Sequence, residues 1–204
     1  MEFLRGAVEE TRISPRKPRV ITLSRQLGGE GRKIAETLET WLQWPLWDKE
    51  ILDAVAGQSF FHHQAREFES LDERVQSNLD AFASSLFGDV DKHLYLHLLP
   101  RAVRAIGRQD AIILGRGAYL VLPDSLKVKI VSSVPARVKR LVEHEGLSVE
   151  EARRRIMASD RGRETFLQEL AGRLGLRRSA SDREAEFDLV VNTDGIGVER
   201  AASI

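Results

Sequence analysis

The chain has 204 residues, 42% of them hydrophobic and 30% charged, with 31 basic residues balanced by 31 acidic ones and no cysteine. This size predicts one domain at residues 20–204, preceded by a lead-in at residues 1–19. The absence of cysteine excludes disulfides, and zero net charge gives no broad electrostatic reason to bind nucleic acid or membranes. We find no apolar stretch typical of a membrane span or secretory signal, and therefore expect a cytoplasmic protein.

The first predicted element is a buried parallel strand at residues 20–24 (VITLS), an apolar run rich in β-branched residues. A glycine-rich turn follows, and then an amphipathic helix is predicted from four apolar residues at helical spacing: Ile34, Leu38, Trp41 and Leu42. The turn is a degenerate form of the phosphate-binding motif G-x-x-x-x-G-K-[ST]. Read back from Gly31, the motif places Gln26 at its first glycine. Arg32 then stands for the lysine and Lys33 for the hydroxyl residue.

This turn has two interpretations, and its spacing alone does not choose between them. The amides of Gly28, Gly29 and Gly31 would form an anion site, because no side chain blocks the approach and the helix dipole favours negative charge. Arg32 would then hold a phosphate through two hydrogen bonds. In the alternative, the segment is a plain strand-to-helix turn with Arg32 and Lys33 in solvent.

Further apolar runs alternate with helical patterns, which predicts a parallel sheet covered by helices on both faces. The expected strands are residues 44–47 (WPLW), 111–114 (AIIL), 127–131 (KVKIV) and 187–192 (FDLVVN). A helix is expected to start at Asp48, which would cap it, and residues 64–107 have a helical pattern. Pro135 opens another helix. Residues 148–151 form a capping box for the next one, with residues 160–163 expected at its end.

Later arginines are candidates for binding an anion. Arg116 follows the strand AIIL directly, and ligands of open α/β sheets bind outside the carboxyl ends of strands. The run DRGR at residues 160–163 also has a plainer interpretation as a solvated charged face. We expect no protein metal site, because zinc sites need three or four convergent ligands and the chain offers only two histidine pairs: His62 with His63, and His93 with His97.

Taken together, these segments resemble the cytidylate kinase-like family, a divergent branch of the P-loop nucleoside monophosphate kinases. The resemblance extends from about residue 20 to residue 202 and rests on five segments in order: SRQLGGEGRKIA, LQWPLWDKEILDAVA, IILGRGAYLVLPDSLKVKIVSSVPARVKRL, SVEEARRRIMASDRGR and FDLVVNTDGIGVERAA. It implies an α/β, three-layer P-loop kinase fold with a parallel five-stranded sheet. A helical acceptor-side subdomain would occupy about residues 58–105, and a lid about residues 155–182.

The resemblance also implies roles for individual residues. The donor phosphates of ATP would be bound by the loop and the end of the preceding strand: Ser24, Arg25, Gly28, Gly29, Gly31, Arg32 and Lys33. Asp48 and Arg116 would lie in the acceptor site, with Arg116 on the acceptor phosphate. The lid would contribute Asp160, Arg161 and Arg163. The catalytic residues among these would be Arg32, Arg116, Arg161 and Arg163.

The implied activity is phosphoryl transfer from ATP, with Mg²⁺, to a nucleoside monophosphate of the CMP type. Two departures bear on turnover: Lys33 replaces the hydroxyl residue that contacts Mg²⁺, and Leu114 replaces the aspartate of a D-G-R triplet. Two alternatives therefore stay open, a kinase of another small phosphoacceptor and a nucleotide or phosphate sensor without turnover. Small-molecule nucleotides are the expected partners, and residues 58–105 offer a surface for a homodimer.

Overall fold

The computed structural model describes residues 19–48, 92–177 and 185–204. The strands are β1 (Val20–Arg25), β2 (Leu46–Trp47), β3 (Ala111–Leu114), β4 (Leu126–Val131) and β5 (Leu189–Asn192). The helices are α1 (Gly31–Leu42), α4 (Lys92–Ile106), α5 (Ala118–Val121), α6 (Val134–Glu145), α7 (Val149–Arg173) and α8 (Val198–Ala202). None of these helices is both long and apolar enough to cross a membrane.

Several sequence predictions fall outside the described residues. These are the lead-in before Arg19, the helix expected after Asp48, the subdomain at residues 58–105 up to residue 91, the side chains of His62, His63 and His93, and the end of the lid at residues 178–182.

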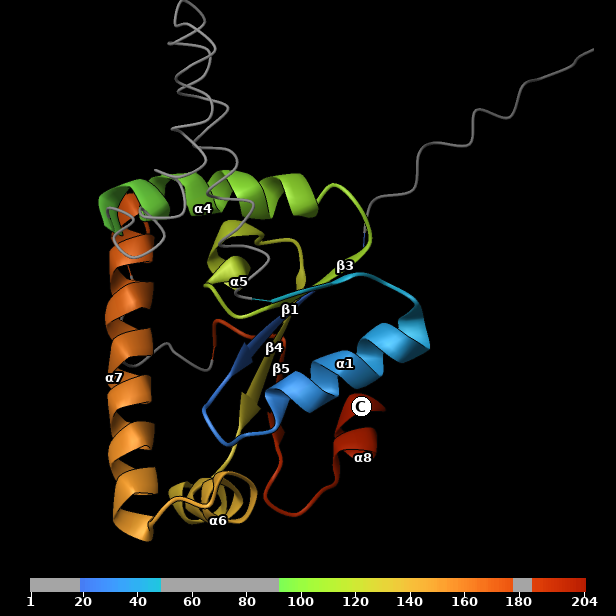
Figure 1. Cartoon of the computed structure of the whole chain (residues 1–204). Coiled ribbons are helices and arrows are strands. Elements are labelled where there is room, and N and C mark those ends of the chain that lie inside the picture. Colours follow the sequence, from blue (N-terminus) through green and yellow to red (C-terminus); the bar gives the residue numbers. More distant parts are fainter. Residues whose placement is uncertain (1–18, 49–91, 178–184) are drawn as a thin grey trace, which may run out of the picture.

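The five strands form one parallel sheet in the order β2-β3-β1-β4-β5 (Figure 1). β1 lies in the middle, where Thr22 pairs with Ile113 of β3 and with Lys127 of β4. The sheet confirms the predicted fold class, with each strand within two residues of its expected bounds. Because all strands run the same way, their carboxyl ends meet at one edge of the sheet.

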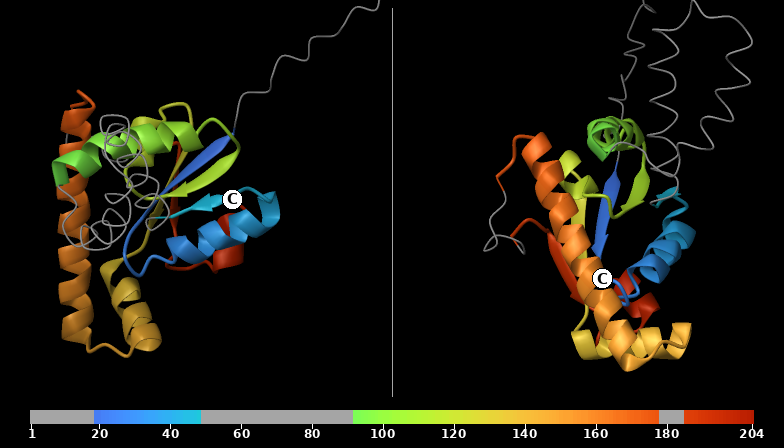
Figure 2. Two further views of the ribbon diagram at one scale, coloured as in Figure 1. Left: turned by 45° about the horizontal axis from the view of Figure 1, so that its top comes forward. Right: turned by 60° about the vertical axis from the view of Figure 1, so that its left-hand side comes forward.

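Helices cover both faces of the sheet, with α4, α5 and α7 on one side and α1 and α8 on the other (Figures 1 and 2). β3 shows why the sequence requires two covered faces. Ala111 and Ile113 pack against α4, α5 and Leu170 of α7, whereas Ile112 and Leu114 pack with residues of α1 and α8. Successive side chains of a strand point to opposite faces, so a continuous apolar run such as AIIL is buried on both.

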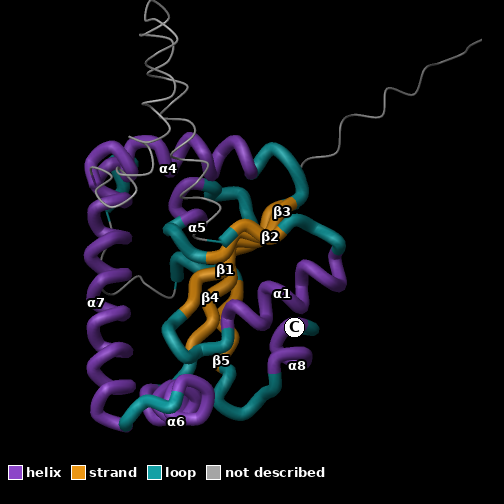
Figure 3. Tube along the Cα trace, in the orientation of Figure 1, coloured by secondary structure: helices purple, strands orange, loops and turns teal. Residues whose placement is uncertain are grey.

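α6 and α7 pack on one another at the end of the sheet, through Val138 and Leu141 of α6 and Ala152 and Ile156 of α7 (Figure 3). Both helices begin at a serine cap, as predicted for α7. The prediction that this helix ends at residues 160–163 is wrong, because α7 continues to Arg173. Gly162 costs only about 1 kcal/mol relative to alanine, and the burial of Leu170 and Ala171 outweighs it.

Candidate functional site

The loop between β1 and α1 lies at the carboxyl edge of the sheet. It turns at Gly28, whose φ is 74°, and at Glu30, whose φ of 60° is also left-handed. A Cβ atom at Gly28 would lie 3.0 Å from the carbonyl oxygen of Arg137, and one at Gly31 would lie 2.6 Å from the Cβ of Arg25. Glycine at these two positions therefore lets α6 and β1 pack directly against the loop.

Three consecutive carbonyl groups of the loop accept hydrogen bonds from side chains outside it. The pairs are Arg137 Nε to Leu27 O (2.7 Å), Arg140 Nη1 to Gly28 O (3.0 Å) and Thr193 Oγ1 to Gly29 O (3.3 Å). In a trans peptide the N–H points away from the carbonyl of the same plane, so the amides that follow point to the opposite side of the loop. One of them, the N–H of Gly29, donates to the carbonyl oxygen of Gln26 at 3.1 Å within the loop. The first N–H groups of α1 also lack an acceptor within the helix, and the side chain of its N-cap residue, Glu30, does not cap them. The loop thus has the geometry of an anion-binding turn.

Asp48, directly after β2, lies between two arginines and is only 7% exposed. Its Oδ1 accepts a hydrogen bond from Arg25 Nη2 at 3.2 Å, and its Oδ2 lies 3.2 Å from Arg32 Nη1. Arg25 ends β1, so the pair spans the carboxyl edge of the sheet. Ser24, the residue before Arg25, is half-buried and is paired with Lys129 of β4 in the sheet. The predicted capping of a helix by Asp48 falls on residues outside the described part of the chain.

Arg116 lies in a turn of three consecutive residues with left-handed φ values: 83° at Gly115, 55° at Arg116 and 62° at Gly117. A left-handed conformation costs a residue with a Cβ atom roughly 1–2 kcal/mol. The turn is fixed by α7, because a Cβ at Gly117 would lie 2.5 Å from Cδ2 of Leu170. The Arg116 guanidinium lies 5.7 Å from the ring centre of Tyr95 and 5.8 Å from that of Phe166, within range of cation–π attraction.

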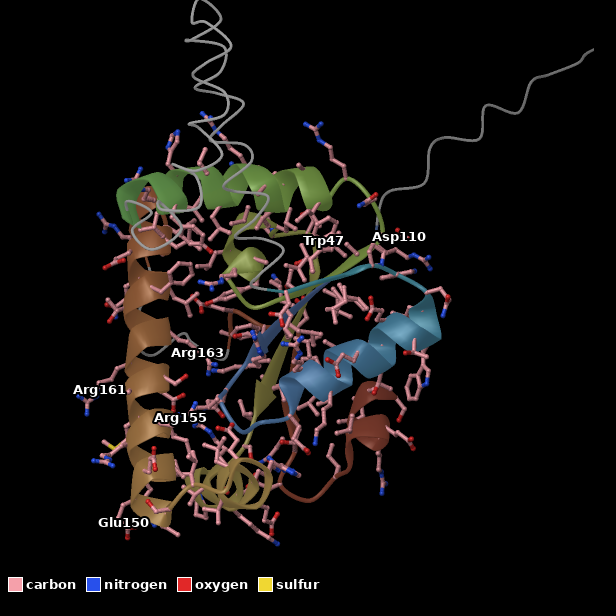
Figure 4. The ribbon with its side chains drawn as sticks, in the orientation of Figure 1. Trp47, Asp110, Glu150, Arg155, Arg161 and Arg163 are labelled. Atoms are coloured by element: carbon pink, nitrogen blue, oxygen red, sulfur yellow. The ribbon has the colours of Figure 1, made fainter. Side chains whose placement is uncertain are left out.

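The three predicted lid residues on α7 do not all face the site (Figure 4). Arg163 points toward the sheet, whereas Arg161 is exposed on the far side of the helix. Asp160 accepts two hydrogen bonds of 2.8 Å from the guanidinium of Arg137. Arg163 Nη1 is buried, has no hydrogen-bond partner within the part of the chain that the structure describes, and lies 4.0 Å from Asp160 Oδ1. Burial of the guanidinium lowers the pKa of Arg163, and the nearby charge of Arg25 lowers it further.

Guanidinium groups from several elements therefore gather near the start of α1. The charges of Arg25, Arg137 and Arg116 each lower the pKa of Arg163, after the larger effect of its burial. Two carboxylates are each shared by two of these arginines: Asp48 by Arg25 and Arg32, and Asp160 by Arg137 and Arg163. Glu36 also pairs with Arg32. Positive charge exceeds negative charge among these groups, and a bound anion would reduce the excess.

Two of the three residues that depart from the phosphate-loop motif, Arg32 and Lys33, pair with acidic neighbours. Arg32 Nε donates to Glu36 at 3.0 Å, Lys33 Nζ donates to Glu30 at 3.0 Å, and both basic side chains are more than half exposed. Neither lies buried under the loop.

The residues present fit an anion better than a metal held by the protein. The oxygens of Asp48 and Asp160 are engaged by arginines, and Lys33 occupies the position of the metal-contacting hydroxyl. Within the three described ranges, no group of three acidic or histidine side chains could hold a metal ion. His97, from one of the two histidine pairs considered as metal ligands, is exposed on α4.

Sequence reasoning missed the residues that fix the loop from outside: Arg137, Arg140 and Thr193. Their positions in the chain could have indicated this role. Arg137 and Arg140 lie on α6, the helix that follows β4, and Thr193 directly follows β5, so all three come from segments that leave the carboxyl edge of the sheet, where ligands of such sheets bind.

Comparison with known proteins gives the fold and the family. A solved structure of an uncharacterized protein from Eubacterium ventriosum ATCC 27560 is 18% identical, with a TM-score of 0.65, and covers 91% of this chain and 94% of its own. Shikimate kinase from Bacteroides thetaiotaomicron is 14% identical, with a TM-score of 0.51 and coverage of 91% and 94%. Comparison with curated proteins returns no match. The model of the cytidylate kinase-like family matches residues 20–195, and the chain therefore belongs to the cytidylate kinase-like family, with a P-loop kinase fold.

Proposed function

We propose that this protein transfers a phosphoryl group from ATP to a nucleoside monophosphate, with CMP as the first acceptor to test. The observation that supports this best is the buried Nη1 of Arg163, which has no hydrogen-bond partner among the described residues and lies 4.0 Å from Asp160 Oδ1, while the charges of Arg25, Arg137 and Arg116 lower the pKa of Arg163. A buried donor left unsatisfied costs about 1–3 kcal/mol, more when it is charged. A phosphate oxygen would remove that cost, and the loop amides face the same end of the sheet.

The chemistry requires little from the protein beyond position and charge. The acceptor phosphate is already ionised, so no general base is needed, and catalysis consists of in-line placement and stabilisation of charge on the transferred group. In this proposal the loop amides and Arg32 bind the donor phosphates, and Arg116 binds the acceptor phosphate. Arg163 then supplies its unpartnered N–H to the transferred group.

The test is an assay of ADP release with ATP and Mg²⁺ against a panel of CMP, dCMP, UMP, AMP, GMP and small alcohols that include shikimate. We expect release with a nucleoside monophosphate and a loss of about a hundredfold in kcat/KM for Arg116→Ala. Arg154→Ala, an exposed arginine on α7, is the matched control. Full transfer by Arg116→Ala with an unchanged acceptor KM would contradict the assignment. Release with an alcohol alone would favour a kinase of another phosphoacceptor.

A second candidate, a nucleotide or phosphate sensor without turnover, is favoured by the contacts of Arg32 and Lys33. Both groups pair with acidic side chains, and both replace residues that phosphate-loop kinases use on phosphate and metal. Calorimetry of ATP binding separates the candidates. Affinity without ADP release for any acceptor supports the sensor, affinity with release supports the kinase, and no affinity contradicts both.

A further inference from the structure

Arg137 connects α7 with the phosphate loop through a single buried guanidinium. It is 1% exposed and is the largest fully buried side chain in the described ranges. Its Nε donates to the carbonyl oxygen of Leu27 at 2.7 Å, and its two terminal nitrogens donate to the two oxygens of Asp160 at 2.8 Å. Such a two-bond fork fixes the orientation of the guanidinium as well as its distance.

The loop is also held to α6 and α7 by direct packing. The side chain of Leu27 packs against the apolar cluster that joins α6 and α7, which includes Val138 and Ile156. A Cβ atom at Gly28 would lie 3.2 Å from both Cα and Cβ of Arg137, so α6 contacts the loop backbone. The first half of the loop is therefore held at two points: the backbone carbonyl of Leu27, which accepts from Arg137, and the side chain of Leu27, which packs against α6 and α7.

Asp160 links this anchor to the arginine that carries the unpartnered N–H. Arg163 is three residues further along α7, and its Nη1 lies 4.0 Å from the same Oδ1 that accepts from Arg137. Residues three apart on a helix share a face. One carboxylate thus lies beside both Arg137, which holds the loop, and Arg163, which carries the unpartnered N–H.

We propose that Arg137 and Asp160 are positioning residues, which hold the phosphate loop in its anion-binding shape and couple it to α7 without binding phosphate themselves. Three N–H groups of Arg137 are committed within the protein, as are both oxygens of Asp160. The ligand in this inference rests on the proposed function, but the effect on the loop does not. A merely structural ion pair is the alternative, and stability alone cannot tell the two apart, because buried pairs often contribute little net stability.

The experiment compares two α6–α7 ion pairs that differ in their relation to the loop. Asp160→Asn removes the carboxylate that holds Arg137, whereas Glu145→Gln removes the partner of Arg155 between the same helices, at an exposed site. Amide hydrogen exchange of residues 26–33 and calorimetric affinity for ATP are measured for each. We expect Asp160→Asn to accelerate exchange and to weaken ATP binding, each by about tenfold or more, and Glu145→Gln to change neither by more than about twofold.

Arg137→Lys keeps the charge but loses the fork, so it is expected to follow Asp160→Asn. Asp160→Glu keeps the charge and the two-bond fork on a longer side chain, and it replaces Asp160→Asn in the experiment if that variant does not fold. We expect its amide exchange rate at residues 26–33 to lie between the rates of the wild type and Arg137→Lys. Wild-type exchange at residues 26–33 in Arg137→Lys and in a folded Asp160 variant overturns the proposal, as does equal acceleration in β5. If the wild type binds no ATP, the proposed function fails, while faster exchange confined to the loop still supports the positioning role.

Discussion

Arg25 and Asp48 join the ends of two strands that are not neighbours in the sheet. Arg25 ends β1, Asp48 follows β2, and β3 lies between these strands, yet Arg25 Nη2 lies 3.2 Å from Asp48 Oδ1. The guanidinium passes over the end of β3, where a Cβ at Gly115 would lie 2.6 Å from Arg25 Nη1. This ion pair therefore closes the edge of the sheet at which the candidate site lies.

Asp48→Asn should destabilise the protein by about 2 kcal/mol. The substitution leaves Arg25 and Arg32 without their shared carboxylate, and the Asp48 side chain is only 10% exposed. Breaking a fully buried pair costs about 3–5 kcal/mol, and partial exposure of the arginines reduces that cost. The measurement is the free energy of unfolding in urea. Glu143→Gln, which breaks an exposed pair with Lys139, is the control and should change stability by less than about 0.5 kcal/mol.

Gly117→Ala should cost more stability than Gly146→Ala, although both glycines have similar φ values of 62° and 67°. An added Cβ meets Leu170 at 2.5 Å in the first case and nothing within 4 Å in the second. We expect a loss of roughly 1 kcal/mol from the backbone strain of Gly146→Ala, and more than about 2 kcal/mol for Gly117→Ala. Equal losses in urea unfolding would show that α7 does not fix the turn before α5.

The stability contributed by Asp194 should disappear in acid. Its carboxylate accepts hydrogen bonds from the Ser132 hydroxyl at 2.6 Å and from the Ser133 N–H at 2.9 Å, and these bonds lower the pKa of Asp194 below the ordinary value of 3.8. A lowered folded-state pKa stabilises the protein above the ordinary pKa, and this stabilisation is lost as the pH falls through the folded value. The difference in unfolding free energy between wild type and Asp194→Asn should therefore stay constant above about pH 5 and shrink as the pH falls from there through the folded-state pKa.

Ser132→Ala removes the larger cause of the lowered pKa. In that variant we expect the Asp194 carboxyl, followed by NMR titration, to move back toward its ordinary pKa. A difference between wild type and Asp194→Asn that stays constant across the acid range would mean that these hydrogen bonds do not favour the ionised carboxylate in the folded protein.

Arg163→Ala should weaken ATP binding by about tenfold or more, and Arg161→Ala far less. The sequence gives both arginines the same role, but Arg163 faces the sheet and Arg161 faces solvent (Figure 4). Calorimetric titration of ATP into both variants, with Arg154→Ala as the baseline for a lost exposed charge, measures the difference. Equal losses for the two arginines would indicate that α7 turns when the nucleotide binds.

The centre of the sheet could be predicted from sequence because the residues of β3 and the middle of β1 are buried on both faces. AIIL in β3 and VITLS in β1 are continuous apolar runs, and such runs leave few interpretations once glycine turns and helices follow them. The turn at Gly28 could be located for the same reason. Its shape could not, because the groups that hold it, such as Arg137, come from α6, more than a hundred residues later in the chain.

The side of α7 that faces the sheet could not be predicted from sequence either. Ile156 and Leu170 are buried, but the inner face between them carries polar residues such as Asp160 and Arg163. Helical periodicity assigns a face only where apolar residues recur, so the polar middle of α7 looked like the end of a helix. Arg161 and Arg163 face opposite sides because the helix continues through Gly162. The helix continues because apolar residues after Gly162, such as Leu170, are buried.

The central position of β1 has a consequence for how the protein is made. β1 leaves the ribosome first, yet its neighbours in the sheet are residues 111–114 and 126–131, and the loop after it depends on Arg137 and Asp160. A nascent chain therefore carries an apolar strand with two open edges until residue 131 has been synthesised, a condition that favours aggregation. Its folding depends on contacts between distant segments and should be slow for its size, and it should benefit from chaperones that shield β1 in the meantime.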